Sequence, residues 1–156
     1  MTKIAPGDKL PDLALTAPDG AVVKPSDFAG QKLVLFFYPK DETPGCTTEN
    51  LDFSALSGDF ANAGTALLGI SKDPPARHQK FIAKHALSAP LASDAADGGL
   101  SDALGFWGEK QNYGRTYMGM IRSTVLVDAE GRIARVWSPV KVKGHAAEVL
   151  DAARSL

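Results

Sequence analysis

The chain has 156 residues, of which 44% are apolar and 22% are charged, and its formal net charge is −1. These values predict one soluble globular domain over residues 1–156, without the charge excess that would indicate a nucleic acid or a membrane surface as a partner. The single cysteine excludes an internal disulfide and a cysteine-built zinc site, and no apolar run reaches the roughly 18 residues of a membrane-spanning helix. Since the first residues also lack the apolar centre of a signal peptide, we expect a cytoplasmic protein.

The first 30 residues predict an arm and a small hairpin. Residues 1–11 contain two prolines and a glycine and are expected to be extended. Residues 13–15 and 21–23 are short β-prone segments on either side of the turn sequence Pro-Asp-Gly, which is typical of a hairpin. A turn or short helical step at residues 26–28 then leads into the main sheet. The hairpin is therefore predicted as an N-terminal extension of that sheet.

The main sheet is expected to begin at residues 33–38, the unbroken apolar run LVLFFY. This run is too short for a helix of its own, and an apolar run without alternation is typical of a parallel strand buried on both faces. Pro39 ends the strand because proline has no N–H group to donate to a neighbouring strand.

A helix is predicted to begin just after this strand and to carry Cys46 in its first turn. Thr43 suits the N-cap, Pro44 suits the first helical position, and Gly45 allows a close approach to the backbone. Cys46 then occupies about the third helical position, where the N–H groups lack intrahelical partners and the helix dipole is positive. Because both features stabilise a thiolate, we expect the thiol pKa to fall from about 8.5 into the range of roughly 3.5–7.5 found for activated cysteines.

Cys46 also has a simpler interpretation. A lone cysteine in an intracellular protein is usually a small, buried and unreactive side chain. Here the cysteine lies among polar and turn residues at the start of a helix rather than within an apolar stripe. This setting favours a reactive thiol over a packing residue.

The rest of the chain predicts alternating helices and strands. The helix that contains Cys46 is expected to run to Gly64, with Phe53, Leu56 and Phe60 on one side. The further elements are a strand at 66–70, a helix at 74–87, a strand at 91–93, an irregular segment at 94–121 with a short helix at 100–104, a hairpin of strands at 124–127 and 133–137, and a helix at 146–153. This order, strand–helix–strand followed by strand–strand–helix, predicts an α/β, thioredoxin-like fold with a central mixed β-sheet and helices on both faces.

Other residue types that could carry chemistry give weaker signals. The large side chains of the irregular segment are interpreted as packing residues, and their spacing leaves open that some line a substrate pocket: Trp107, Tyr113, Met118 and Met120. The three histidines are scattered without a metal-ligand spacing, so no metal or cofactor is predicted: His78, His85 and His145.

Four segments within roughly residues 33–128 carry a resemblance to a known family: FFYPKDETPGCTTE, LLGISKD, FWGEKQNYGRTYMG and IRSTVLVD. The first contains the frame Pro-x-x-x-Thr-x-x-Cys, and the last contains Arg-Ser-Thr at the start of a predicted strand. With these motifs the chain resembles the peroxiredoxins, and among them the bacterioferritin-comigratory-protein or peroxiredoxin Q branch. The resemblance implies a thiol-dependent peroxidase that reduces hydrogen peroxide and organic hydroperoxides through a cysteine sulfenic acid.

The resemblance also implies a role for five residues. Cys46 corresponds to the peroxidatic cysteine, Thr43 to the threonine whose hydroxyl contacts the peroxide, and Pro39 to the proline that shields the site from water. Arg122 corresponds to the arginine that stabilises the thiolate and the breaking O–O bond. Glu49 corresponds to the glutamate that orients this arginine.

One position departs from the family pattern. Many members of this branch have a second cysteine five positions after the first, where this chain has Leu51, and the helix predicted at residues 74–87 has no cysteine either. The chain therefore resembles a one-cysteine peroxiredoxin. An external thiol has to recycle it, with thioredoxin or glutaredoxin and glutathione as the candidates, and we expect a monomer.

A reactive cysteine also serves other classes of protein. A cysteine hydrolase needs a histidine base, and no histidine lies within 30 residues of Cys46 in the sequence. A dithiol oxidoreductase needs the Cys-x-x-Cys motif, which a chain with one cysteine cannot form. A redox sensor that is oxidised once and then signals to a partner stays open, because it needs the same reactive thiolate.

Overall fold

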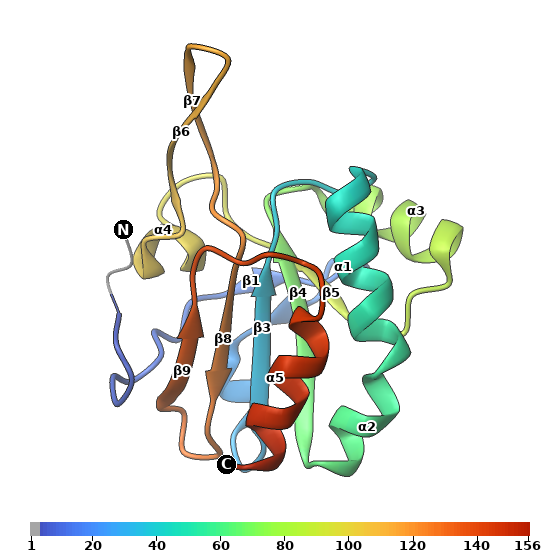
Figure 1. Ribbon diagram of the computed structural model, residues 1–156, viewed down its shortest axis with the longest axis vertical. Helices are drawn as coiled ribbons and strands as arrows, with labels where there is room; N and C mark the ends of the chain where they lie inside the picture. Colours follow the sequence, from blue (N-terminus) through green and yellow to red (C-terminus); the bar gives the residue numbers. More distant parts are fainter. Residues whose placement is uncertain (1–3) are drawn as a thin grey trace.

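A seven-stranded mixed sheet forms the centre of the computed structural model, which describes residues 4–156 (Figure 1). The strands of this sheet, in spatial order, are β2 (Val22–Val23), β1 (Leu15–Thr16), β5 (Leu91–Ser93), β4 (Thr65–Ser71), β3 (Lys32–Phe37), β8 (Ser123–Val127) and β9 (Ile133–Trp137). A separate hairpin consists of β6 (Trp107–Asn112) and β7 (Arg115–Met120). The helices are η1 (Pro25–Phe28), α1 (Pro44–Ala55), α2 (Ser57–Asn62), α3 (Pro75–His85), α4 (Leu100–Leu104) and α5 (His145–Arg154).

The order of strands agrees with the prediction. β3 pairs with β4 in parallel and with β8 antiparallel, and β8 pairs with β9 antiparallel before the chain enters α5. The predicted thioredoxin-like fold with a central mixed sheet is therefore confirmed, and β1 and β2 extend it as the predicted N-terminal hairpin. The predicted extended arm begins outside the described residues. Within residues 4–156, no helix is long and apolar enough to span a membrane.

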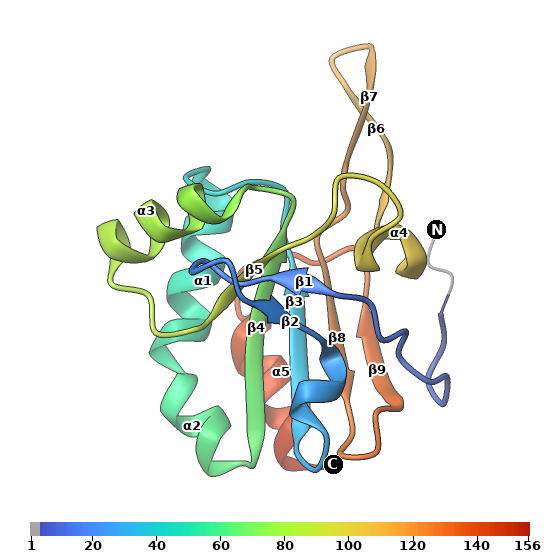
Figure 2. The same ribbon diagram turned by 180° about the vertical axis from the view of Figure 1, so that it is seen from behind.

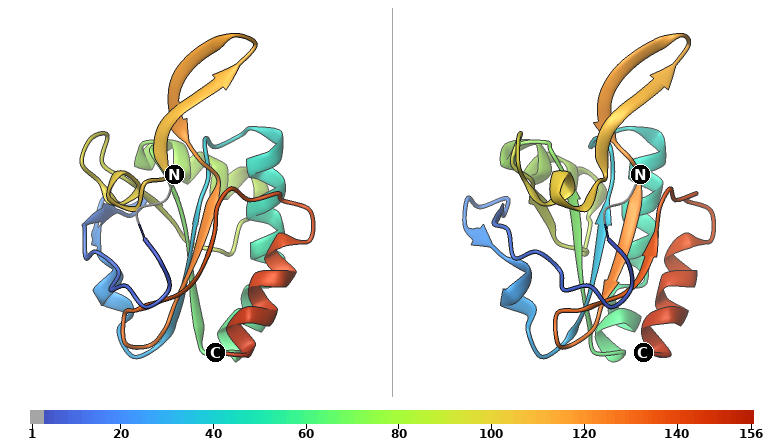
Figure 3. Two further views of the ribbon diagram at one scale, coloured as in Figure 1. Left: turned by 60° about the vertical axis from the view of Figure 1, so that its left-hand side comes forward. Right: turned by 90° about the vertical axis from the view of Figure 1, so that its left-hand side faces the viewer.

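Strand β3 lies in the middle of the sheet, and its side chains alternate between two cores. Val34 and Phe36 belong to a core shared with α1, α2, α3 and α5, while Leu35 and Phe37 belong to a core shared with α4 and the N-terminal segment. The two faces of the sheet are seen from opposite sides in Figures 1 and 2, and the sheet is seen nearly edge-on in Figure 3. Burial on both faces explains why this strand is the most continuous apolar run of the chain.

Gly69 in β4 allows α1 to lie close to β3. A Cβ atom at this position would overlap the ring of Phe36 and the side chain of Leu91, so only glycine fits. The ring of Phe36 stacks on that of Phe53 in α1, with a centroid distance of 4.3 Å. This contact fixes the position of the helix that carries Cys46.

The predicted single helix from Cys46 to Gly64 is wrong, because the chain forms two helices there. α1 ends at Ala55, and α2 begins at Ser57 after Leu56, whose ψ of 4° departs from helical geometry. Serine and glycine at positions 57 and 58 are weak helix formers, so the chain can bend here. The bend still leaves Phe53 and Phe60 in one core.

The segment predicted as mostly irregular forms the hairpin β6–β7, which extends away from the sheet in all views (Figures 1–3). Its turn has positive φ at both Tyr113 (51°) and Gly114 (77°), as a two-residue hairpin turn of type I′ requires. Met120 is buried as predicted, but Tyr113 is 97% exposed and Met118 is 54% exposed. The packing roles predicted for these two residues are therefore wrong, because the strands pair with each other rather than with the central sheet.

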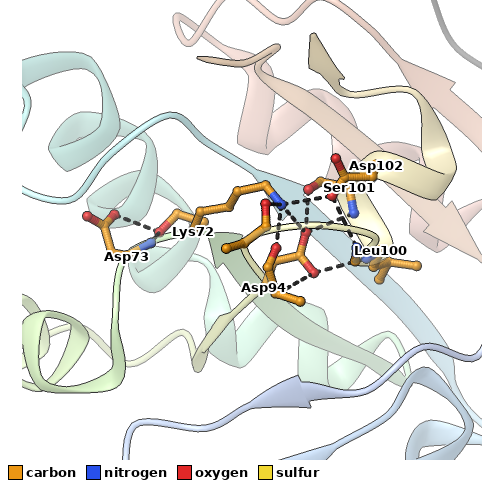
Figure 4. Close-up of polar contacts among 10 residues, drawn as sticks. Lys72, Asp73, Asp94, Leu100, Ser101 and Asp102 are labelled. Atoms are coloured by element: carbon orange, nitrogen blue, oxygen red, sulfur yellow. Dashed lines mark hydrogen bonds and ion pairs between the residues drawn. The ribbon is translucent and has the colours of Figure 1, made fainter. Parts of the chain in front are cut away.

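Figure 4 shows a charged cluster that holds α4 against the ends of β4 and β5. The ammonium group of Lys72 lies 2.8 Å from Asp102 and 3.5 Å from the buried carboxylate of Asp94. Asp94 also accepts hydrogen bonds from the amides of Leu100 (2.9 Å) and Ser101 (3.0 Å). The first turn of α4 is thus capped by a side chain from outside the helix.

Candidate active site

Cys46 is the third residue of α1, as predicted, and its side chain is 1% exposed. Thr43 has the extended backbone of an N-cap, but its side chain makes no capping hydrogen bond. Its hydroxyl donates instead to the carbonyl of Lys40, at 2.8 Å. Thr43 is therefore the N-cap residue, as predicted, but without a capping hydrogen bond from its side chain. Glu42, between Lys40 and Thr43, has a positive φ of 71°.

Arg122 is brought to Cys46 by the pairing of two strands. It directly precedes β8, whose Ser123 pairs with Phe37 at the end of β3, and β3 leads through the 38–43 loop into α1. The guanidinium Nη2 lies 3.3 Å from the Cys46 Sγ, and Nη1 donates to Glu49 Oε1 at 2.5 Å. One planar cation thus contacts the thiol and the carboxylate together.

The charge on Arg122 is secured by its neighbours. Burial lowers the guanidinium pKa, but Glu49 and Cys46 raise it by more, so the pKa lies above its ordinary value. The arginine stays protonated at every physiological pH. A fixed positive charge therefore lies beside the sulfur.

Gly45 leaves little space beside this arginine. A Cβ atom built on Gly45 would lie 3.2 Å from Arg122 Nη2, which is closer than most contacts to a Cβ atom. The close approach predicted at this glycine is therefore made by a side chain of the same chain.

Glu49 is 1% exposed, and its second carboxylate oxygen has no hydrogen-bond partner within the described residues. Burial raises the pKa of Glu49 to about 7, and the lowering effect of Arg122 does not cancel this shift. The carboxyl group therefore ionises near neutral pH rather than near its ordinary value of 4.5.

We predict that Glu49 makes the protein less stable as the pH rises. Its pKa is raised in the folded protein, so between about pH 4.5 and pH 7 the folded state binds more protons than the unfolded state. The free energy of unfolding should fall over this window, by about 3 kcal/mol for a shift of this size. Urea denaturation at several pH values should show that Glu49→Gln removes most of this decrease. Glu130→Gln, on an exposed turn, is the control and should keep it.

The structure brings three of the five predicted site residues into direct contact, namely Cys46, Glu49 and Arg122. Thr43 and Pro39 lie on the loop that joins β3 to α1, and both are half-buried. Asp41, on the same loop, and His78, in α3, form a fully buried pair that the sequence did not predict. Their separation of 37 positions left no local signal.

Comparisons with known proteins agree with this geometry. Residues 6–136 match the model of the AhpC/TSA family. Peroxiredoxin Bcp of Bacillus subtilis (strain 168) is 45% identical over 150 residues, which cover 96% of this chain and 95% of the relative.

Two solved structures are similar in both sequence and fold. The bacterioferritin comigratory protein of Xanthomonas campestris, described by its alkyl peroxide reduction activity, has a TM-score of 0.86 and 40% identity, covering 95% of this chain and 98% of its own. A cysteine-to-serine mutant of PrxQ from Xylella fastidiosa has a TM-score of 0.90 and 37% identity, covering 97% and 96%. The chain therefore belongs to the AhpC/TSA family and, within it, to the Bcp or peroxiredoxin Q branch of the peroxiredoxins, which makes it a thiol peroxidase.

Proposed function

We propose that Cys46 is the peroxidatic cysteine and that it reduces hydrogen peroxide and organic hydroperoxides. The observation that carries this proposal is the contact of the Cys46 sulfur with the guanidinium of Arg122, at 3.3 Å, in the first turn of α1. A cation and the positive end of a helix dipole both favour the thiolate, which is the nucleophile in thiol chemistry. The alkyl peroxide reduction named for the relative from Xanthomonas campestris supports the organic substrates.

The reaction follows from these charges. The thiolate attacks the terminal oxygen of the hydroperoxide, the S–O bond forms, and the O–O bond breaks. Cys46 becomes a sulfenic acid, while the leaving oxygen departs as alkoxide or hydroxide and takes up a proton. Negative charge moves from sulfur to the leaving oxygen, where Arg122 and the backbone N–H of Cys46 can stabilise it.

Thr43 and Pro39 complete the site in this proposal. The Thr43 hydroxyl donates its hydrogen to the carbonyl of Lys40. The Thr43 oxygen can therefore accept a hydrogen bond from the hydroperoxide O–H. This bond would hold the terminal oxygen in line with the sulfur. Pro39 would keep water away from the same space, since its ring offers neither a donor nor an acceptor.

Recycling needs an external thiol. The sulfenic acid condenses with a thiol to a disulfide and releases water, and a second thiol then frees Cys46. The chain has no other cysteine, so thioredoxin, or glutaredoxin with glutathione, would supply both thiols. Because the Cys46 side chain is 1% exposed, the first turn of α1 has to open before a protein thiol can reach it.

The proposal extends to a monomer in the cytoplasm. The contacts among Cys46, Glu49 and Arg122 lie within one chain, so the site needs no residue from a second copy. A free thiol stays available in a reducing compartment, which supports the cytoplasm.

The test is the fate of the protein with one equivalent of hydrogen peroxide. We expect a sulfenic acid at Cys46, trapped by a dimedone-type reagent and located by peptide mass spectrometry. Steady turnover should follow with dithiothreitol and with either the thioredoxin system or glutathione plus glutaredoxin. A protein that reacts once and then stalls with every reductant would be a redox sensor, and absence of any reaction at Cys46 would overturn the proposal.

A further inference from the structure

A buried polar cluster lies between α3 and the loop that joins β3 to α1. Asp41 on this loop is fully buried. Its Oδ1 accepts a hydrogen bond from the hydroxyl of Tyr38 at 2.6 Å, and its Oδ2 lies 2.6 Å from Nδ1 of His78 in α3. An ionised carboxylate can only accept, so the Nδ1 atom of His78 carries the hydrogen of this contact.

The backbone of Asp41 is fixed as well as its side chain. Its amide donates to Oδ2 of Asp73 at 2.8 Å, and the same oxygen accepts from the hydroxyl of Ser71 at 2.7 Å. Ser71 is the last residue of β4, and His78 lies in α3. Asp41 is therefore held by three parts of the chain: Asp73 just after β4, His78 in α3, and Tyr38 just after β3.

The next residue is held from the outer side by the same helix. Glu42 has φ of 71°, a backbone conformation that is uncommon outside glycine. Its carboxylate pairs with Lys84 at 2.9 Å and lies 3.4 Å from Nε2 of His85, and both residues are at the end of α3. Thr43 follows directly and leads into the first turn of α1. The loop is thus held to α3 by two contacts. The outer one joins Glu42 to Lys84, and the buried one joins Asp41 to His78.

We propose that His78 is a positioning residue for the peroxidase reaction, acting through Asp41 on the loop that carries Thr43 and leads to Cys46. The inference rests on the proposed function of this site. His78 contacts neither the sulfur nor the peroxide; it sets where the Thr43 oxygen and the Cys46 amide lie relative to the thiolate. Loss of its Nδ1–H leaves a buried carboxylate without one of its partners, and the loop then shifts to restore a hydrogen bond.

The test uses three substitutions that differ in where they place a donor. Asn keeps a nitrogen donor the same number of bonds from the backbone as Nδ1, Gln moves the donor one bond farther out, and Leu has none. For each variant, two rate constants of Cys46 are measured: one with hydrogen peroxide and one with iodoacetamide. Alkylation needs the thiolate but not the donors and acceptors that orient a peroxide.

For His78→Leu and His78→Gln we expect the peroxide rate constant to fall at least tenfold, while the alkylation rate constant does not fall. His78→Asn should restore the peroxide rate to within about threefold of wild type. Lys80→Ala, on the exposed side of α3, is the matched control and should keep both rates. If His78→Leu does not fold, the comparison of Asn with Gln carries the test, since both have the same amide group.

A second measurement addresses the route of the effect. In a Thr43→Val background, His78→Gln should lower the peroxide rate by much less than in the wild type, because both substitutions remove the same contribution. The inference is overturned if His78→Gln reacts with peroxide at the wild-type rate, or if the peroxide rate constant falls by the same factor in the Asn and Gln variants. A wild-type protein that does not react with peroxide would instead contradict the proposed function itself.

Discussion

Serine in place of Cys46 should abolish peroxide consumption with every reductant. A serine hydroxyl stays protonated beside Arg122 at neutral pH and does not attack the O–O bond, and the chain has no second thiol to take over. Serine is close in size to cysteine, so the buried site is kept, at a cost of about 1–3 kcal/mol in the free energy of unfolding. A hydrogen peroxide assay with dithiothreitol measures the effect.

The control is to show that the Cys46→Ser variant is folded. Circular dichroism and urea denaturation should show a folded protein that binds no thiol reagent. Residual turnover above the background of the reductant would mean that another group carries the reaction, and Cys46 would then lose its assigned role.

Arg122→Ala should lower the rate constant of Cys46 with hydrogen peroxide by about 10²–10³, the usual effect of removing one donor to a developing oxyanion. The arginine contacts the sulfur through one nitrogen and Glu49 through the other, so the Arg122→Ala variant loses both contacts at once. Arg122→Lys keeps the charge but cannot make both contacts in the same plane, and it should recover only part of the rate. Stopped-flow measurement of sulfenic acid formation distinguishes the three proteins.

Removal of Arg122 also leaves the buried carboxyl of Glu49 without its partner. The double variant Arg122→Ala/Glu49→Gln avoids an unpaired charge and should be as slow as Arg122→Ala while unfolding less easily. Arg115→Ala, on the exposed hairpin, is the matched control and should keep the wild-type rate. Equal rates for Arg122→Ala and wild type would remove this arginine from the mechanism.

The residues around Cys46 show what local sequence signals can predict. An unbroken apolar run, a proline at its end and the Thr-Pro-Gly sequence act over only a few residues, and they placed Cys46 correctly in the first turn of a helix. The partners of Cys46 came from the family resemblance, since nothing between positions 46 and 122 indicates that these residues meet. Their contact depends on the pairing of β3 with β8.

By itself, then, the sequence indicated which segments form the main strands and where α1 begins, because each of these features rests on neighbours along the chain. The tertiary structure alone decided the direction of the Thr43 hydroxyl, the bend at Leu56 and the separation of the hairpin β6–β7 from the central sheet. It also decided the burial of Asp41 against His78. These features depend on strand register and on how helices cover the sheet, and such contacts join residues that no short pattern connects.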